Sequence, residues 1–241
     1  MTTTRLREAL LLANRYTLAH LSNRQATALP ALRQQYDQSK QLYSQQLQEM
    51  VAFELQGSEL SRLEAVQKLA PQVFGMAEKM MGLHQQQVEL EARLMGMRNQ
   101  FLRLDDSYRS AADLLLQFTS SKRSLHNKAE LITSGIARDI KQIQRTDANT
   151  DLLSLEKVLA KDIEISSKRL ENIVVPDDVK QRFSRNVELL KKLAFGEQGL
   201  IRTLVQDQQL TREVLAAQAE LDRLSNQVNQ ELQALIDVTS Q

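Results

Sequence analysis

The segment that decides the fold begins with SELSRLE (residues 58–64) and meets no comparable stop signal before TSS (residues 119–121). Ser61 and Glu64 form a capping box, in which the hydroxyl accepts from free N–H groups and the carboxylate complements the helix dipole. Apolar residues recur at spacings of three and four throughout. The pattern predicts one helix of about 60 residues, or about 90 Å at 1.5 Å per residue.

Pro71 lies inside this predicted helix. Proline lacks the backbone N–H of a normal helical hydrogen bond, and its ring crowds the preceding turn. The sequence therefore predicts either a kink or a break at Pro71.

The composition is that of long helices packed along narrow seams. The 241 residues include only 7 Gly, 3 Pro and 4% aromatic residues, whereas 42% are hydrophobic, which favours an all-α protein. The absence of Cys excludes disulfides, thiolate metal sites and cysteine catalysis. The 31 basic and 30 acidic residues are interspersed rather than gathered into a basic stripe, so we expect no nucleic-acid partner.

The remaining breaks in the pattern predict five more helices. The first helix ends near Ser22 and Asn23, and Asn23 is a candidate cap for the next one. Further ends are expected at Gly57, which accepts a positive φ, and at the turn formed by residues 146–149. The expected ranges are about 122 to 145 for the fourth helix, about 150 to 172 for the fifth, and from Pro176 toward the end for the sixth.

Short connections make successive helices antiparallel neighbours. The order short, short, long, short, short, long then predicts two stacked four-helix bundles that share the two long helices. Counting residues along each helix gives a membrane-proximal bundle from residues 1–95 and 200–241 and a distal bundle from residues 96–199. Gly96 and Gly199 fall at the expected join, where they serve either close helix packing or a bend.

No pattern of a catalytic site is present. None of the three histidines completes a Glu-x-x-His motif, and the chain has no Gly-rich phosphate loop, nucleophile elbow or zinc-spaced cluster. We therefore expect no enzyme activity, no metal and no cofactor.

The longest apolar run, residues 9–13, is too short to span a bilayer. Without a signal sequence, the chain is either a soluble protein or a fragment, and its abrupt helical ends favour a fragment.

Five polar residues interrupt or border the apolar stripes at about one level of the proximal bundle. They are Arg15, Tyr36, His84, Thr203 and Arg212. Arginines beside hydroxyl and imidazole groups suit a small carboxylate, which a guanidinium binds with two hydrogen bonds. Ordinary structural roles are open as well: Arg15 reaching water, and Tyr36 and His84 as core residues. The stretch with Thr203, Asp207 and Arg212 holds either an internal ion pair between Asp207 and an arginine or simply an exposed sector of the helix.

The size, the order of the six helices and the opening TRLREALLLANRYTLAHL (residues 4–21) resemble the helical bimodular sensor domain of bacterial transmembrane receptors. That family comprises methyl-accepting chemotaxis proteins and some sensor histidine kinases. The resemblance implies a periplasmic domain of an inner-membrane receptor, flanked by transmembrane helices outside these residues. It also implies a homodimer and a small ligand, often an organic acid.

The family's ligand contacts are arginines of the first helix and threonine and arginine of the last. The resemblance assigns them to Arg15, Thr203 and Arg212. The match is incomplete, because no second arginine lies one turn from Arg15 and Arg212 is rotated away from the main stripe. Either the ligand differs, or a dimer interface grasps it.

Three functions are therefore open at this point. The first is a chemoreceptor domain that binds an organic acid and signals across the membrane by helix displacement. The second is the sensor domain of a histidine kinase that reads a periplasmic binding protein. The third is a structural adaptor rod that binds proteins through its helix faces.

Overall fold

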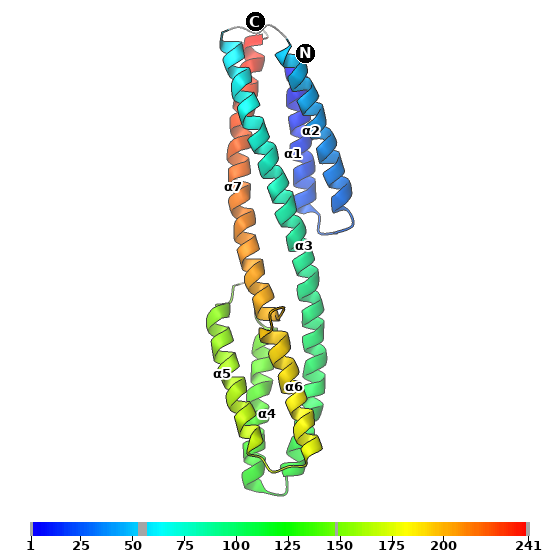
Figure 1. Ribbon diagram of the computed structural model, residues 1–241, viewed down its shortest axis with the longest axis vertical. Coiled ribbons are helices and arrows are strands. Elements are labelled where there is room, and N and C mark those ends of the chain that lie inside the picture. Colours follow the sequence, from blue (N-terminus) through cyan, green and yellow to red (C-terminus); the bar gives the residue numbers. More distant parts are fainter. Residues whose placement is uncertain (1, 53–56, 148, 240–241) are drawn as a thin grey trace. The chain divides into compact units, whose positions relative to one another are not determined.

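The computed structural model describes residues 2–52, 57–147 and 149–239, and their regular structure is helical throughout (Figure 1). The helices are α1 (Thr2–Ser22), α2 (Leu29–Val51), α3 (Ser58–Thr119), α4 (Arg123–Gln144), α5 (Leu152–Glu171), α6 (Asp177–Phe195) and α7 (Leu200–Thr239). The all-α fold class, with its two long helices, is confirmed. The outermost residues of the expected proximal bundle (1, 240 and 241) and Ala148 of the expected turn lie outside the described residues.

The first compact unit comprises Met1–Glu89 and Leu210–Gln241 and is called unit 1 below. It contains α1, α2, the first half of α3 and most of α7, with α1 and α2 as a helical hairpin (Figure 1). One face of α2 is buried, because residues three, four and seven apart share one side of a helix. Its buried members are Leu29, Tyr36, Ser39, Tyr43 and Met50.

The second unit, unit 2, comprises Leu90–Gln209. It contains the second half of α3, helices α4 to α6 and the first ten residues of α7. Its core is built from aliphatic side chains and the aromatic residues Phe101, Tyr108 and Phe183. The ring centroids of Tyr108 and Phe183 lie 5.4 Å apart. The observed units divide at residues 89 and 209, whereas helix lengths gave 95 and 199. That either unit is an independent domain stays a prediction.

The expected sixth helix consists of two helices, α6 and α7, separated by residues 196–199. A Cβ on Gly196 would lie 2.6 Å from the carbonyl oxygen of Lys192, and one on Gly199 would lie 2.7 Å from that of Ala194. The backbone therefore passes too close to itself for a side chain at either position. The Gly199 carbonyl then accepts from the N–H of Thr203 at 3.0 Å, which begins α7. The continuous helix was a wrong expectation because both glycines serve a turn.

Pro71 does not break α3, which runs without interruption from Ser58 to Thr119. Proline removes one intrahelical hydrogen bond, but the buried neighbours Ala70, Val73 and Phe74 hold this turn against the core. Of the two expected outcomes at Pro71, a break is excluded.

Two turn signals act locally rather than as helix ends. Asn23 accepts from the backbone N–H of Gln25 at 2.8 Å and does not cap α2, which begins six residues later with Pro30 in its first turn. Gly57 has a φ of +57°, the left-handed conformation that glycine adopts most easily. It stands directly before α3, and residues 53–56 lie outside the described part.

Within the described residues, no helix has the length and apolarity that a membrane span requires.

We expect Gly199→Ala to destabilise the chain and Gly96→Ala to stabilise it slightly. The new methyl group at position 199 would clash with the backbone, whereas nothing lies within 4 Å of one at position 96. The expected changes in the free energy of unfolding are a loss of about 1–3 kcal/mol and a gain of up to about 1 kcal/mol. Urea denaturation followed by circular dichroism measures both. Equal effects of the two substitutions would show that the 196–199 turn tolerates a side chain.

Candidate functional site

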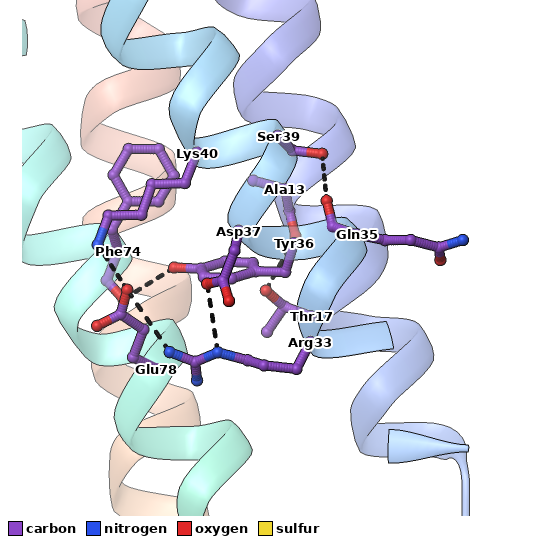
Figure 2. Close-up of polar contacts among 10 residues, drawn as sticks. All are labelled: Ala13, Thr17, Arg33, Gln35, Tyr36, Asp37, Ser39, Lys40, Phe74 and Glu78. Carbon is purple, nitrogen blue, oxygen red and sulfur yellow. Dashed lines mark hydrogen bonds and ion pairs between the residues drawn. The ribbon is translucent and has the colours of Figure 1, made fainter. Parts of the chain in front are cut away.

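A cluster of charged and aromatic side chains lies where α2 packs on α3 in unit 1 (Figure 2). Glu78 of α3 is its centre: its Oε1 lies 2.6 Å from Nζ of Lys40 and 3.8 Å from Nη2 of Arg33. Arg33 also places Nε 3.4 Å from Oδ1 of Asp37, one turn later on α2. All four side chains are partly exposed, so each pair contributes at most about 1 kcal/mol.

Aromatic rings form the floor beneath these charges. The rings of Tyr36 and Tyr43 both meet Phe74 edge-on, with centroids 6.3 and 5.1 Å apart, respectively. The Tyr36 hydroxyl donates to the carbonyl oxygen of Phe74 at 3.1 Å, a bond that ties α2 to α3. The guanidinium carbon of Arg33 lies 5.4 Å from the Tyr36 ring centroid, and Nζ of Lys40 lies 5.9 Å from that of Phe74. These are cation–π distances.

The helical period explains why these residues meet. Arg33, Tyr36 and Lys40 follow one another at intervals of three and four on α2, so they lie on one side of this helix (Figure 2). From there Arg33 lies over the Tyr36 ring, whereas Lys40 reaches the Phe74 ring of α3. Phe74 and Glu78 stand four apart on α3, with the ring buried and the carboxylate at the surface. Burial raises the pKa of the Tyr36 phenol, with the nearby Glu78 adding to the effect, so this hydroxyl stays a donor.

A pair of histidines is buried in the same unit. His20 of α1 and His84 of α3 are 2% and 3% exposed, and their ring centroids lie 5.3 Å apart in an edge-to-face arrangement. No described group hydrogen-bonds Nδ1 of His20. Burial lowers the pKa of His20 to about 4, and the charges of His84 and Arg33 act in the same direction. His20 is therefore neutral at neutral pH.

The structure places the five candidate ligand residues in different settings. Tyr36 and His84 are buried in unit 1, whereas Arg15 and Arg212 of the same unit are exposed. Thr203 belongs to unit 2, where its buried hydroxyl donates to the Gly199 carbonyl at 2.9 Å. Their role in binding a ligand stays a prediction.

Sequence reasoning missed Arg33, Lys40, Glu78 and His20. The spacing of Arg33, Tyr36 and Lys40 was a readable signal, because intervals of three and four place the three residues on one side of a helix. The pairing of His20 with His84 had no such signal, since it depends on how α1 packs against α3. The sequence also offered an ion pair between Asp207 and a nearby arginine. One of those arginines, Arg202, places its Nη2 3.6 Å from Oε1 of Glu156 of α5.

Unit 2 contains a buried acid. Asp139 is 1% exposed on the inner face of α4, among Ile132, Ile136, Ile140 and Ile143. Its nearest cation is Arg138, whose Nε lies 3.6 Å from Oδ1 and whose Nη2 lies 3.6 Å from Asp162 of α5. Burial raises the pKa of Asp139 to about 6; Asp162 adds to the rise and Arg138 opposes it.

The side chains described above offer charged and aromatic contacts and groups that bind protons. Within the described ranges, no three His, Cys, Asp or Glu side chains form a group that could hold a metal ion. The α2–α3 cluster presents both charge signs over an aromatic floor, a combination suited to recognition of a polar partner.

No protein-family model matches the chain, and no curated protein matches it significantly. Two solved structures are similar over almost its whole length. One is the TorS sensor domain–TorT complex in the presence of TMAO, with a TM-score of 0.72, 11% identity and 100% coverage of both chains. The other is the sensor domain of the histidine kinase sensor TorS of V. parahaemolyticus, with a TM-score of 0.65, 16% identity and coverage of 98% of this chain and 99% of that one. The chain therefore has the fold of these helical sensor domains.

We expect unfolding of unit 1 to become easier as the pH falls. The folded pKa of His20, about 4, is below its ordinary value of 6.5, so the unfolded chain binds a proton that the folded chain refuses. The stability contributed by neutral His20 is complete above about pH 6.5 and is lost between about 6.5 and 4. Urea denaturation at several pH values, with His20→Leu beside the wild type, measures this. His126→Leu in α4 is the control, and a pH profile unchanged by His20→Leu would contradict the expectation.

The pH dependence of stability that Asp139 contributes has the opposite sign to that of His20. Its folded pKa of about 6 lies above the ordinary 3.8, so the folded chain keeps a proton that the unfolded chain releases. Stability therefore decreases as pH rises from about 4 to about 6 and stays lower above that range. We expect Asp139→Asn to unfold at higher urea concentration than the wild type above about pH 7, with the gain disappearing near pH 4. The exposed Asp106→Asn on α3 is the control. A variant less stable than the wild type at neutral pH would mean that the charge of Asp139 is required.

Proposed function

We propose that the chain is the extracytoplasmic sensor domain of a bacterial inner-membrane receptor of the histidine-kinase type, and that its input is a periplasmic binding protein. The observation that carries the proposal is the full-length likeness to two TorS sensor domains. One of them is the sensor of a histidine kinase, and the other is in complex with a second protein, TorT. The proposed role is non-enzymatic.

The placement of the polar side chains supports a protein as the input. The hydroxyls of Tyr36 and Thr203 already donate to backbone carbonyls within the fold, at 3.1 and 2.9 Å. Arg15 and Arg212 are exposed, where a protein surface reaches them easily. An organic acid bound by the chain alone would instead need these groups to turn toward one point. The chemoreceptor with a carboxylate ligand is therefore the second candidate.

The proposal includes a homodimer. Leu11 and Leu18 of α1 are 48% and 64% exposed, and Arg15 stands between them. Intervals of four and three place the three on one stripe of α1, the spacing of a helix–helix seam. A second copy packed along this stripe would cover two leucines that otherwise face water.

We expect the purified chain to show no thermal shift with organic acids, and to retain a binding protein from periplasmic extract of its own bacterium. The reason is that neither exposed arginine is held in a preformed carboxylate site. Differential scanning fluorimetry with mono- and dicarboxylates measures the first expectation, and affinity capture followed by mass spectrometry and calorimetry with the purified partner measures the second. Arg15→Ala and Arg212→Ala are the informative variants. A rise in Tm with an organic acid alone, abolished by either variant, would replace this proposal with the chemoreceptor.

A further inference from the structure

The outward side of α4 in unit 2 carries a straight stripe of exposed residues, called the α4 face below. It consists of Leu131, Ser134, Arg138, Lys141 and Arg145. Their intervals of three and four keep them in line along the helix. The inner side of α4, with its row of isoleucines, packs into the core, so the stripe is the face that the fold itself leaves open.

Three open grooves meet on this face. One runs between α3 and α4, with Ala112, Leu116 and Ala137 among its walls. Another lies between α4 and α5, and a third follows the second half of α4. Ser134 lines all three, and Leu131, 63% exposed, lines the first two. A leucine flanked by hollows on both sides is the shape of a protein contact, because a partner can fill both grooves and cover the leucine.

The charge of the face is basic toward the end of α4. Lys141 and Arg145 have no carboxylate within 4 Å among the described residues, and Arg169 lines the adjoining groove. The negative end of the helix dipole favours cations in the last turn, which accounts for Arg145 and partly for Lys141. The dipole does not explain an exposed leucine ten residues earlier or the grooves beside it.

We infer that the α4 face docks an acidic surface of a protein partner; the inference rests on the proposed function and names the surface through which the binding protein is read. Nucleic acid fits poorly, since the 31 basic and 30 acidic residues of the chain are interspersed and form no long basic stripe that could follow a phosphate backbone. A second copy is disfavoured where the two-fold axis passes near the end of α4, since Lys141 and Arg145 would then face their own copies. An acidic protein satisfies the cations and covers Leu131.

The test places a photo-crosslinking amino acid at position 131 of the whole chain and, as a matched control, at Leu189, an exposed leucine (44%) on α6 of the same unit. Each purified chain is irradiated in periplasmic extract of its own bacterium, and adducts are identified by mass spectrometry. We expect position 131, and not position 189, to capture a solute-binding protein. Calorimetry with that purified protein should then show at least about tenfold weaker binding for Lys141→Glu/Arg145→Glu, and wild-type binding for Arg182→Glu/Arg185→Glu on α6.

The outcomes separate this inference from the proposed function. A binding protein captured only from position 189, or bound equally well by Lys141→Glu/Arg145→Glu, would overturn the α4 face and leave the proposed function standing. An adduct of position 131 with a second copy of the chain would overturn the acidic partner. If no protein is captured from either position and the unlabelled chain retains none, both the inference and the proposed function fail. Circular dichroism confirms that every variant is folded.

Discussion

Both compact units depend on one constraint, the unbroken pattern of apolar residues along α3. Its 62 residues supply a wall to each core, with Phe74 and Met81 buried in unit 1 and Phe101 and Tyr108 buried in unit 2. A proline interrupts the hydrogen-bond ladder at position 71, and burial of the surrounding residues is enough to keep the helix whole. The shorter helices are arranged around what α3 presents to them. Tyr36 bonds to the Phe74 carbonyl in unit 1, and in unit 2 the hydroxyl of Tyr108, from α3 itself, donates to the Thr133 carbonyl of α4.

Much of this architecture could be predicted from local signals. The range of α4 followed from the spacing of its apolar residues and from the turn residues at its ends, because both the buried face and the ends of an amphipathic helix can be read from its sequence. The division between α6 and α7 could not, since glycine in a helical pattern serves either packing or a turn, and only the backbone around Lys192 and Ala194 decides which. The candidate site divides in the same way. Tyr36 was recognisable as a polar group on an apolar stripe, whereas the meeting of His20 with His84 depends on packing between helices that are distant in sequence.

Two of the buried titratable groups, His20 and Asp139, give stability opposite dependences on pH. Neutral His20 favours a folded unit 1 at higher pH, and neutral Asp139 favours a folded unit 2 at lower pH. Each is a local consequence of placing one polar side chain in an apolar interior without a strong opposite charge. A fall in pH therefore lowers the stability of unit 1 through His20, whereas a rise in pH lowers the stability of unit 2 through Asp139.

The turn at Gly196–Gly199 has a mechanical consequence. A continuous helix resists compression along its axis because each turn is bonded to the next, and that ladder is interrupted between Phe195 and Leu200. An axial displacement of α7 therefore has no continuous helical hydrogen-bond ladder along which to reach α6. What connects the first turns of α7 to the core of unit 2 is side-chain packing, chiefly that of the buried Leu200, Ile201 and Leu204. Helix α6 therefore packs as one of the separate helices around the core of unit 2, and the first turns of α7 are held in that core by side-chain contacts.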